Sequence, residues 1–386
     1  MATTNFTKLL DHQKKAWSME TWSQARNMSY VNRFVGSGSN SMIQRITELK
    51  KTEKGTKAII TLTADMLTDG VTGDNTLEGN EEELKAYDFE VTMDQLRNAN
   101  LLEGRMADQA SIVNFRKESK DKLSYWLADR MDQMAFLSLS SIPYTKTCTG
   151  GVRPVLAAGQ NLSELAFSPD QLGAAFQAPT AGRGFHLKST GVTAGTGFDA
   201  TDGSLVPLSY RAIVQIQALA KDRYLKGLRG KGGDEIYHMF VTPQGMADLK
   251  LDADFIANVR NAGVRGDKNS LFAGTSTSIM VDGLMIHEFR HVYNNRNGAN
   301  GTRFGTTSGN DFGQRVLVCG AQALGMADIG PGYWNEKTFD FDNQLGISYG
   351  KIFGYAKPQF KGNPFNPAAK EDFGVITVDT AVSAFV

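Results

Sequence analysis

The stretch YDFEVTM, residues 87–93, decides the fold, because apolar and polar side chains alternate along its whole length. Successive side chains of a β-strand point to opposite faces, so the apolar ones would share one face. A second strand-like run, KAIITLT, occupies residues 57–63. The two runs predict a long β-hairpin. A lone hairpin is only marginally stable in water, so its apolar face must pack against something else.

Between the two runs lies LTDGVTGDNTLEGNEEEL, residues 67–84, a glycine-rich segment with many carboxylates. Its carboxylates do not have the spacing of an EF-hand calcium loop. Two interpretations therefore stay open, a solvated acidic loop and a loop that pairs with basic residues of a neighbouring subunit. The residues of the hairpin that we expect at an inter-subunit contact are Asp74, Glu78, Glu81, Glu82, Tyr87 and Phe89.

Residues 1–50 are polar and interrupted, and they contain GSGSNS at residues 36–41. Such a run is poorly suited to a helix or a central strand, so the segment is interpreted as an extended N-terminal arm. Aromatic side chains on an arm must be buried elsewhere, because the arm itself offers no core. We therefore expect Trp17 and Trp22 to contact another subunit.

A helical period starts near Asp108 and continues to about Ser140. Its apolar residues recur at spacings of three, four or eight, as on one face of an amphipathic helix. Pro143 stops the helix, because the residue before a proline avoids the helical region. A helix of about thirty residues would be roughly 45 Å long, which is enough to span a whole domain.

The remainder of the chain alternates between helical and strand-like patterns. Residues 144–205 are rich in glycine, threonine and alanine with little periodicity, and are interpreted as an insertion. An amphipathic helix follows around residues 213–224, and strands dominate from Ile279 onward. This mixture predicts an α+β protein with two intertwined regions.

The pentapeptide HEFRH, residues 287–291, matches the H-E-x-x-H pattern of zinc peptidases. That motif works on a helix, where both histidines share a face. Here Asp282-Gly283 separates two short apolar runs, which predicts a two-residue turn and a strand over residues 284–293. On a strand the two histidines would lie about 13 Å apart, too far for one zinc ion. We therefore expect no metal site, with a zinc metallopeptidase as the alternative.

The charge balance argues against a dedicated nucleic-acid binder, because 41 basic and 41 acidic residues give a net charge of zero. A DNA- or RNA-binding module is still a rival hypothesis. Two cysteines, Cys148 and Cys319, are too few for a disulfide framework. With no apolar signal core and no long apolar run, we expect no membrane contact. We also expect neither a cofactor nor catalysis. The rival module would use Lys221, Arg223, Lys226, Arg229 and Lys231.

The order of arm, acidic hairpin, long helix and mixed region resembles that of the HK97-like major capsid proteins of tailed bacteriophages. It is more similar still to the capsid family typified by the podophage N-four. In the first half of the chain the resemblance rests on GVTGD (70–74), LEGNEE (77–82), DQLR (94–97) and LSYWLADRMDQ (123–133). Further along it rests on IHEFRHV (286–292), GAQAL (320–324) and DFGVITVD (372–379).

The resemblance implies a non-enzymatic subunit that assembles into hexamers and pentamers of an icosahedral head around double-stranded DNA. Implied partners are further copies of the chain, portal, scaffolding and decoration proteins, and non-specifically contacted DNA. The place of the protein would be the virion shell, after assembly in the cytoplasm of the bacterial host. The implied division is an N-terminal arm (1–50), an extended loop (51–100), the spine helix of a peripheral domain (101–143), an uncertain insertion (144–205), a mainly axial domain (206–335) and return strands of the peripheral domain (336–386).

Overall fold

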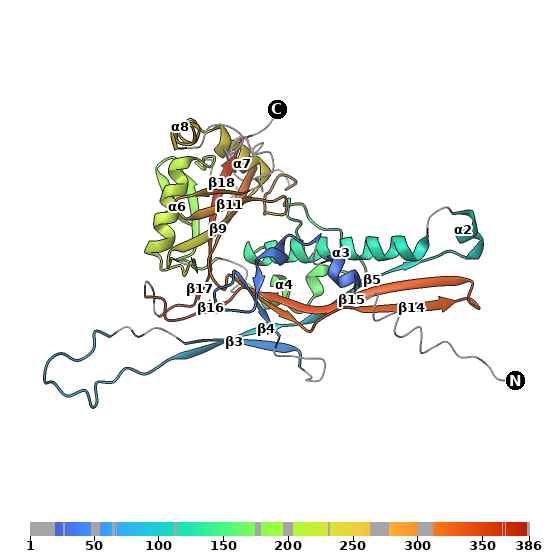
Figure 1. The fold of residues 1–386 in the computed structure, drawn as a ribbon, viewed down its shortest axis with the longest axis horizontal. Coiled ribbons are helices and arrows are strands. Elements are labelled where there is room, and N and C mark those ends of the chain that lie inside the picture. The colour runs from blue at the N-terminus through green and yellow to red at the C-terminus, as the bar shows by residue number, and fades with distance from the viewer. Residues whose placement is uncertain are drawn as a thin grey trace.

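The computed structural model divides the chain into two sheet-based units, with a hairpin that projects beyond them (Figure 1). Helices and strands are mixed along the chain, so the predicted α+β class is confirmed. In the part of the chain that the structure describes, no helix is long and apolar enough to span a membrane. The described residues are 20–25, 28–47, 55–63, 66, 68–111, 114–173, 179–195, 204–230, 232–262, 278–298, 312–364, 366 and 368–383.

The first unit is a six-stranded sheet. Its strands are β1 (Val35–Gly36), β2 (Ile43–Ile46), β5 (Asp94–Leu101), β13 (Leu324–Asp328), β14 (Tyr333–Phe339) and β15 (Gln344–Ala356). The long strand β15 is its centre, since it pairs in antiparallel register with β5, β13 and β14. The short strands β1 and β2 come from the predicted arm and extend the sheet beside β13. Part of the arm is therefore built into the body of its own subunit.

One long helix, α3 (Phe115–Leu139), packs against β15 and β5. The Asn114 side chain caps its first turn by accepting a hydrogen bond from the Lys117 backbone N–H. The helix ends at Ser140, as predicted, and Ser141 has a left-handed backbone with φ of 59°. The predicted start near Asp108 is wrong, because a separate short helix, α2 (Arg105–Ala110), comes first. With 25 residues, α3 is about 37 Å long.

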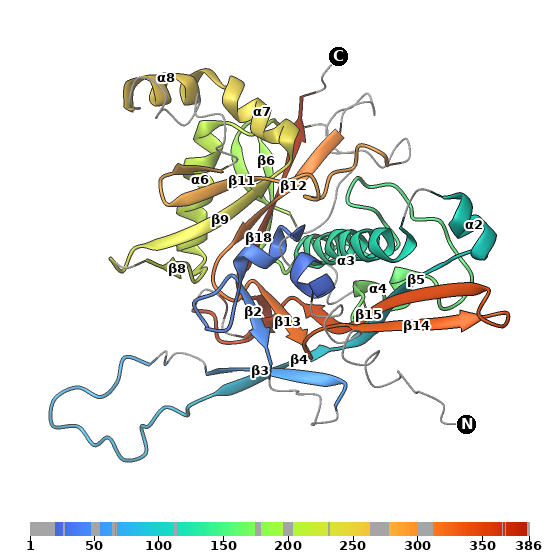
Figure 2. The same ribbon diagram turned by 45° about the vertical axis from the view of Figure 1, so that its right-hand side comes forward.

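The second unit is an eight-stranded sheet that shares one core with three helices (Figure 2). Its helices are α6 (Tyr210–Asp222), α7 (Pro243–Leu251) and α8 (Ala253–Ala262). Its strands are β6 (Gly184–Lys188), β7 (Gly191–Ala194), β8 (Leu228–Arg229), β9 (Glu235–Val241), β10 (Ser278–Val281), β11 (Leu284–Glu288), β12 (Phe312–Cys319) and β18 (Val375–Val382). On α6 the apolar face buries Ile213 and Ile216 completely, which explains the helical period of this segment.

The projecting hairpin consists of β3 (Lys57–Thr63) and β4 (Ala86–Thr92), as the alternating pattern predicts. The strands are antiparallel, and Thr63 lies opposite Ala86 where the acidic loop begins. The range 51–100 predicted for the extended loop is too long, because β5 belongs to the six-stranded sheet. Remaining short elements are η1 (Val31–Phe34), η2 (Leu162–Glu164), α4 (Pro169–Leu172), β16 (Gln359–Phe360) and β17 (Glu371–Asp372).

The chain crosses between the two units more often than the sequence predicts. Strand β18 does not return to the six-stranded unit with β15 but lies between β12 and β6. All eight of its residues are buried, so it needs neighbours on both edges and cover on both faces, which the larger sheet supplies. Two other predicted segments are also divided between the sheets. The six-stranded sheet contains β13 and β14, although β13 and the first residues of β14 fall within the predicted axial range 206–335. The eight-stranded sheet contains β6 and β7, which fall within the predicted insertion 144–205.

Candidate assembly surfaces

The apolar face of the hairpin is buried within its own subunit. Ile60, Phe89 and Val91 pack with residues of β13, β15 and β16, and the ring centroids of Phe89 and Phe360 are 6.1 Å apart. Only 9% of Phe89 is exposed, and Tyr87 is half-buried. This corrects the expectation that Phe89 packs against a neighbouring subunit. The sequence near the hairpin offers no core, but strands more than 200 residues away supply one.

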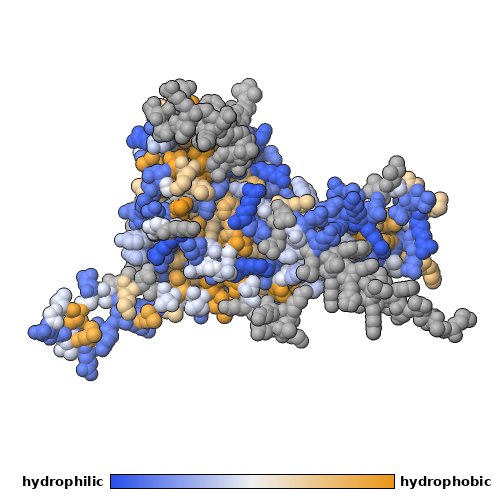
Figure 3. Space-filling model, in the orientation of Figure 1, coloured by the Kyte–Doolittle hydropathy of each residue, from blue (hydrophilic) through white to orange (hydrophobic). Residues whose placement is uncertain are grey.

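The acidic tip of the hairpin, defined here as residues 68–85, is different. It contributes no buried apolar residue to the clusters of the described chain. Asp74, Glu78 and Glu81 are exposed, and Glu82 is half-buried because it accepts hydrogen bonds from the Thr68 backbone N–H and hydroxyl at 3.0 and 2.7 Å. Figure 3 shows the tip projecting beyond the body, with a small hydrophobic cluster inside a hydrophilic surface. The exposed carboxylates of Asp74, Glu78 and Glu81 can therefore contact another subunit.

The arm is fastened to the body by Trp22. The Lys351 ammonium lies 3.3 Å from the centre of the Trp22 ring, a close cation–π contact. Lys351 also donates to the Gly330 carbonyl at 2.8 Å and forms an ion pair with Asp328 at 2.7 Å. Trp22 is 8% exposed, so its own subunit buries it, and the predicted inter-subunit role of this residue is corrected. The other predicted arm residue, Trp17, lies outside the described residues.

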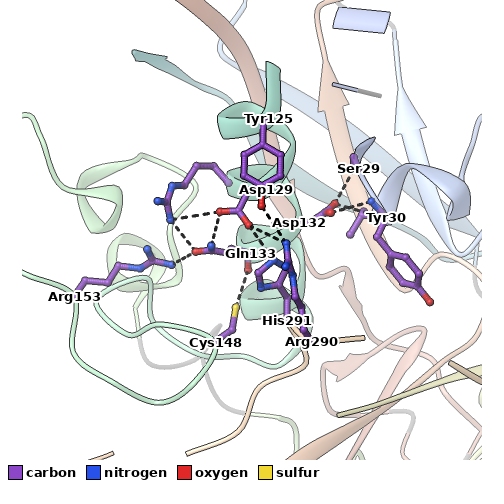
Figure 4. Close-up of polar contacts among 12 residues, drawn as sticks. Ser29, Tyr30, Tyr125, Asp129, Asp132, Gln133, Cys148, Arg153, Arg290 and His291 are labelled. Carbon is purple, nitrogen blue, oxygen red and sulfur yellow. Dashed lines mark hydrogen bonds and ion pairs between the residues drawn. The ribbon is translucent and has the colours of Figure 1, made fainter. Parts of the chain in front are cut away.

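A second fastening joins the arm to the long helix (Figure 4). The Asp132 carboxylate of α3 accepts hydrogen bonds from the Ser29 hydroxyl at 2.6 Å and from the backbone N–H groups of Tyr30 and Val31 at 2.8 and 3.1 Å. Burial raises the pKa of Asp132, and these hydrogen bonds oppose that effect. Because three donors converge on one carboxylate, the arm is held in a defined position on the helix.

The HEFRH segment lies where the larger sheet meets the helix. The predicted strand 284–293 is too long, because β11 ends at Glu288 and a turn follows. The Phe289 N–H still donates to the Val241 carbonyl at 3.0 Å, but beyond it the chain bends toward α3. His291 Nε2 lies 3.0 Å from Asp129 Oδ1, and this hydrogen bond is the main reason why the pKa of Asp129 is lowered. The motif thus serves as a junction between the two units.

The two histidines of the motif have different partners. His287 Nε2 lies 2.8 Å from His238 Nδ1 and its ring packs beside the Phe34 and Phe240 rings, whereas His291 contacts α3. Within the described ranges no group of three or more metal-ligating side chains comes together. The arrangement therefore gives no support to a zinc metallopeptidase.

The buried histidine pair makes the stability of the subunit depend on pH. Burial lowers the pKa of His238 to about 4, and burial with the neighbouring charges lowers that of His287 to about 4. The unfolded value is about 6.5, so protonation favours the unfolded state, and stability is full above pH 6.5 and lost toward pH 4. From pH 7 to 5 we expect one such group to cost about 2 kcal/mol of unfolding free energy.

This expectation is checked by chemical denaturation of the unassembled subunit at both pH values. A His238→Gln/His287→Gln variant retains a hydrogen-bonding pair without an imidazole. Because it removes both titrating groups, it should lose about 4 kcal/mol less than the wild type between pH 7 and 5. An equal loss in both proteins would contradict the assignment.

The basic residues of the rival nucleic-acid hypothesis do not form one exposed stripe. Arg223 is half-buried, with its guanidinium 5.7 Å from the Phe185 ring centre, and Lys231 lies outside the described residues. Lys221, Lys226 and Arg229 line a cleft instead. The sequence interpretation missed two further basic residues of this cleft, Lys361 and the buried Arg183, since neither lies in a recognisable motif.

Sequence reasoning also missed the buried ion pair of Arg315 and Asp379. Arg315 Nε and Nη2 donate to the two carboxylate oxygens at 2.7 and 2.9 Å, across the β12–β18 ladder. Arg315 Nη1 also donates to the Ser140 carbonyl at the end of α3, at 2.9 Å. A charged residue inside each apolar run, QRVLVC and VITVDTAV, is the signal that could have pointed to this pair.

Comparison with known proteins agrees with the fold. A family model described as phage capsid protein matches residues 3–384. The major capsid protein of Pseudomonas phage KPP25 is 50% identical over 379 residues, covering 98% of this chain and 97% of that protein. The solved capsid of Ralstonia phage GP4 is similar with a TM-score of 0.68 and 23% identity over 92% of both chains. The capsid of cyanophage Pam1 also gives 0.68, with 18% identity over 92% and 93%.

Two independent observations therefore agree. The architecture is shared with solved capsids, and the sequence matches a major capsid protein along almost the whole chain. The projecting acidic hairpin and the arm on the long helix agree with them. The chain belongs to the phage capsid protein family, and it is a major capsid protein with the HK97-like fold.

Proposed function

We propose that the chain assembles into hexamers and pentamers that close an icosahedral head around double-stranded DNA. The observation that carries this proposal is the acidic tip, which projects from the body and contributes to no core of its own subunit. A repeated contact between such a limb and the next copy is head-to-tail, and a head-to-tail contact that closes on itself makes a ring. Rings of five and six are the units from which closed icosahedral shells are built.

The two units would have separate places in such a ring. We assign the eight-stranded unit to the axial domain, around the five-fold and six-fold positions. The six-stranded sheet and α3 would form the peripheral domain, with α3 as its spine and the hairpin as the extended loop. The junction of Asp129 with His291 and the pair of Arg315 with the end of α3 support this assignment, because they hold both domains in one rigid relation.

The remaining partners follow from the same role. Portal, scaffolding and decoration proteins would contact the assembled shell, which would form in the cytoplasm of the bacterial host. Net charge is zero, so contact with packaged DNA would be non-specific and would involve few phosphates. The inter-subunit contacts of the tip would come from its carboxylates, with Asp74, Glu78 and Glu81 the most exposed of the predicted set.

Electron microscopy of the overexpressed chain tests this function, with and without the co-expressed scaffolding protein of its phage. Closed shells of uniform diameter are expected in at least one of the two preparations. Particles that stay the size of one subunit in both preparations would contradict the proposal. Tight binding of nucleic acid by such a single subunit, with a steep loss of affinity as salt rises, would favour the nucleic-acid alternative.

A further inference from the structure

A cleft of about 680 Å³ opens beside the end of β3, where the acidic loop begins. Its walls come from the end of α6 with the loop that follows, from the segment between β16 and β17, and from Leu62 and Thr63 of β3. The volume lies in the range of clefts that hold a ligand or a short peptide segment. Nothing in the shell role described so far uses this cleft.

The rim of the cleft is basic. Lys221, Lys226, Arg229 and Lys361 line it, and all four are exposed, so they outnumber the exposed carboxylate of Glu235 among the described lining residues. Lys226 lies 5.7 Å from the Phe373 ring centre. Among the described residues, no carboxylate lies within ion-pair distance of Lys221, Arg229 or Lys361, although most buried cations of this chain are paired. The cleft therefore attracts a partner with several negative charges.

The floor of the cleft contains a buried polar pair with unused hydrogen-bonding capacity. Arg183 is 2% exposed, and its Nε lies 3.5 Å from Glu371 Oε2. Arg183 Nε and Nη1 and Glu371 Oε1 have no hydrogen-bond partner within the described protein. Leaving such groups unpaired costs about 1–3 kcal/mol each, so a partner that satisfies them gains affinity. The floor offers donors and an acceptor together, which suits a polypeptide better than a phosphodiester, because the latter has acceptors only.

The acidic tip of the hairpin has the matching chemistry. Residues 68–85 contain six carboxylates and one basic residue, Lys85. Leu77 and Leu84 are 61% and 65% exposed, and the cleft has wall residues such as Tyr224 and Phe373 to cover them. In its own subunit the tip leaves the ends of β3 and β4 and leads away from the body (Figure 1).

We propose that this cleft receives the acidic tip of a second copy of the chain. The proposal rests on the proposed shell function and adds the receiving site to it. Tip carboxylates pair with Lys221, Arg229 and Lys361, and backbone groups of the tip reach Arg183 and Glu371. The contact joins two different surfaces of the same protein. Each subunit therefore gives its tip to one neighbour and its cleft to the other, so the contact can repeat around a ring.

Charge reversal with rescue tests the pairing. A Lys221→Glu/Lys361→Glu variant is expected to give at least tenfold fewer shells than wild type, counted by electron microscopy. Adding Glu78→Lys/Glu83→Lys in the tip should restore shells, because opposite charges then face each other again. A matched control, Lys117→Glu/Lys122→Glu, reverses two exposed cations on α3 and should assemble normally. Normal assembly of the first variant, or failure of the rescue, would overturn the proposal.

A disulfide test measures the contact directly. Leu77→Cys combined with Lys361→Cys should give covalently linked chains up to the size of a ring after mild oxidation of assembled particles. The native Cys148 and Cys319 are buried, so the background is low. Leu77→Cys with Lys117→Cys serves as the control and should give no such ladder. Assembled shells without a ladder would refute the docking site and leave the shell function standing.

The charge-reversal shells also separate a protein partner from nucleic acid. If the Lys221→Glu/Lys361→Glu variant forms normal shells that merely retain less DNA, the cations contact packaged phosphates and the proposal fails. If wild-type chains form no shells at all, the proposed function fails with it. Each of these outcomes is recognised in the same micrographs and in the absorbance ratio of purified particles.

Discussion

Shells are expected to disappear when residues 64–85 are replaced by an Asn-Gly turn. Thr63 and Ala86 are paired at the end of the hairpin, so a two-residue turn can connect them directly. The shortened hairpin keeps Ile60, Phe89 and Val91 in the core, so the free energy of unfolding should stay within about 1 kcal/mol of the wild-type value. Assembly, in contrast, loses the segment that we place in the neighbouring copy. Microscopy and denaturation of the same preparation measure both quantities.

Two controls make this deletion informative. A glycine-serine segment of the original length keeps the reach of the loop and removes its carboxylates and leucines. If only the chemistry matters, this variant also fails to assemble; if the length alone matters, it assembles. Shells of wild-type size from the shortened chain would refute the role of the tip altogether.

An Asp379→Ala substitution is expected to lower the free energy of unfolding by about 3–5 kcal/mol. Asp379 and Arg315 are each 1% exposed, and both carboxylate oxygens accept hydrogen bonds from the guanidinium. Removing one partner leaves the other charge buried and unpaired, which destabilises the folded protein by about 3–5 kcal/mol. Because Arg315 also holds the Ser140 carbonyl, the contact between the larger sheet and α3 should loosen as well.

Denaturant unfolding of the unassembled subunit measures this cost. An Arg315→Met/Asp379→Leu variant removes both charges and should recover most of the lost stability, since apolar replacements of buried pairs are often neutral or better. The exposed pair of Lys57 and Glu90 is the matched control, and Glu90→Ala should change stability by less than about 1 kcal/mol. A loss below 1 kcal/mol in Asp379→Ala would contradict our description of the pair.

The hairpin shows which features a local sequence pattern can predict and which it cannot. The alternation from Tyr87 to Met93 predicts a strand, and β4 (Ala86–Thr92) confirms it. The same pattern cannot say what covers the apolar face, because the covering strands lie far away in the sequence. This is why Phe89 and Trp22 were predicted at a subunit contact although their own subunit buries them. An apolar face shows only that a partner exists, and the partner can be the same chain.

The HEFRH segment shows a different limit. The turn residues Asp282-Gly283 lead to the right conclusion that a strand, and not a zinc-binding helix, contains His287. They do not reveal that the strand ends at Glu288, because that end is set by the contact of His291 with Asp129 on α3. Likewise, no periodicity predicts that β18 joins the larger sheet, since a fully apolar strand fits any buried position.

By itself the sequence determined the α+β class, the hairpin with its acidic loop, the end of the long helix and the membership of a capsid family. Each of these depends on residues that are neighbours in the chain, or on the order of such segments. The tertiary structure alone decided which sheet the arm and β18 join, the pairing of Arg315 with Asp379, and the basic cleft beside the end of β3. These depend on side chains from distant segments, whose burial and pairing energies exist only once the whole chain has brought them together.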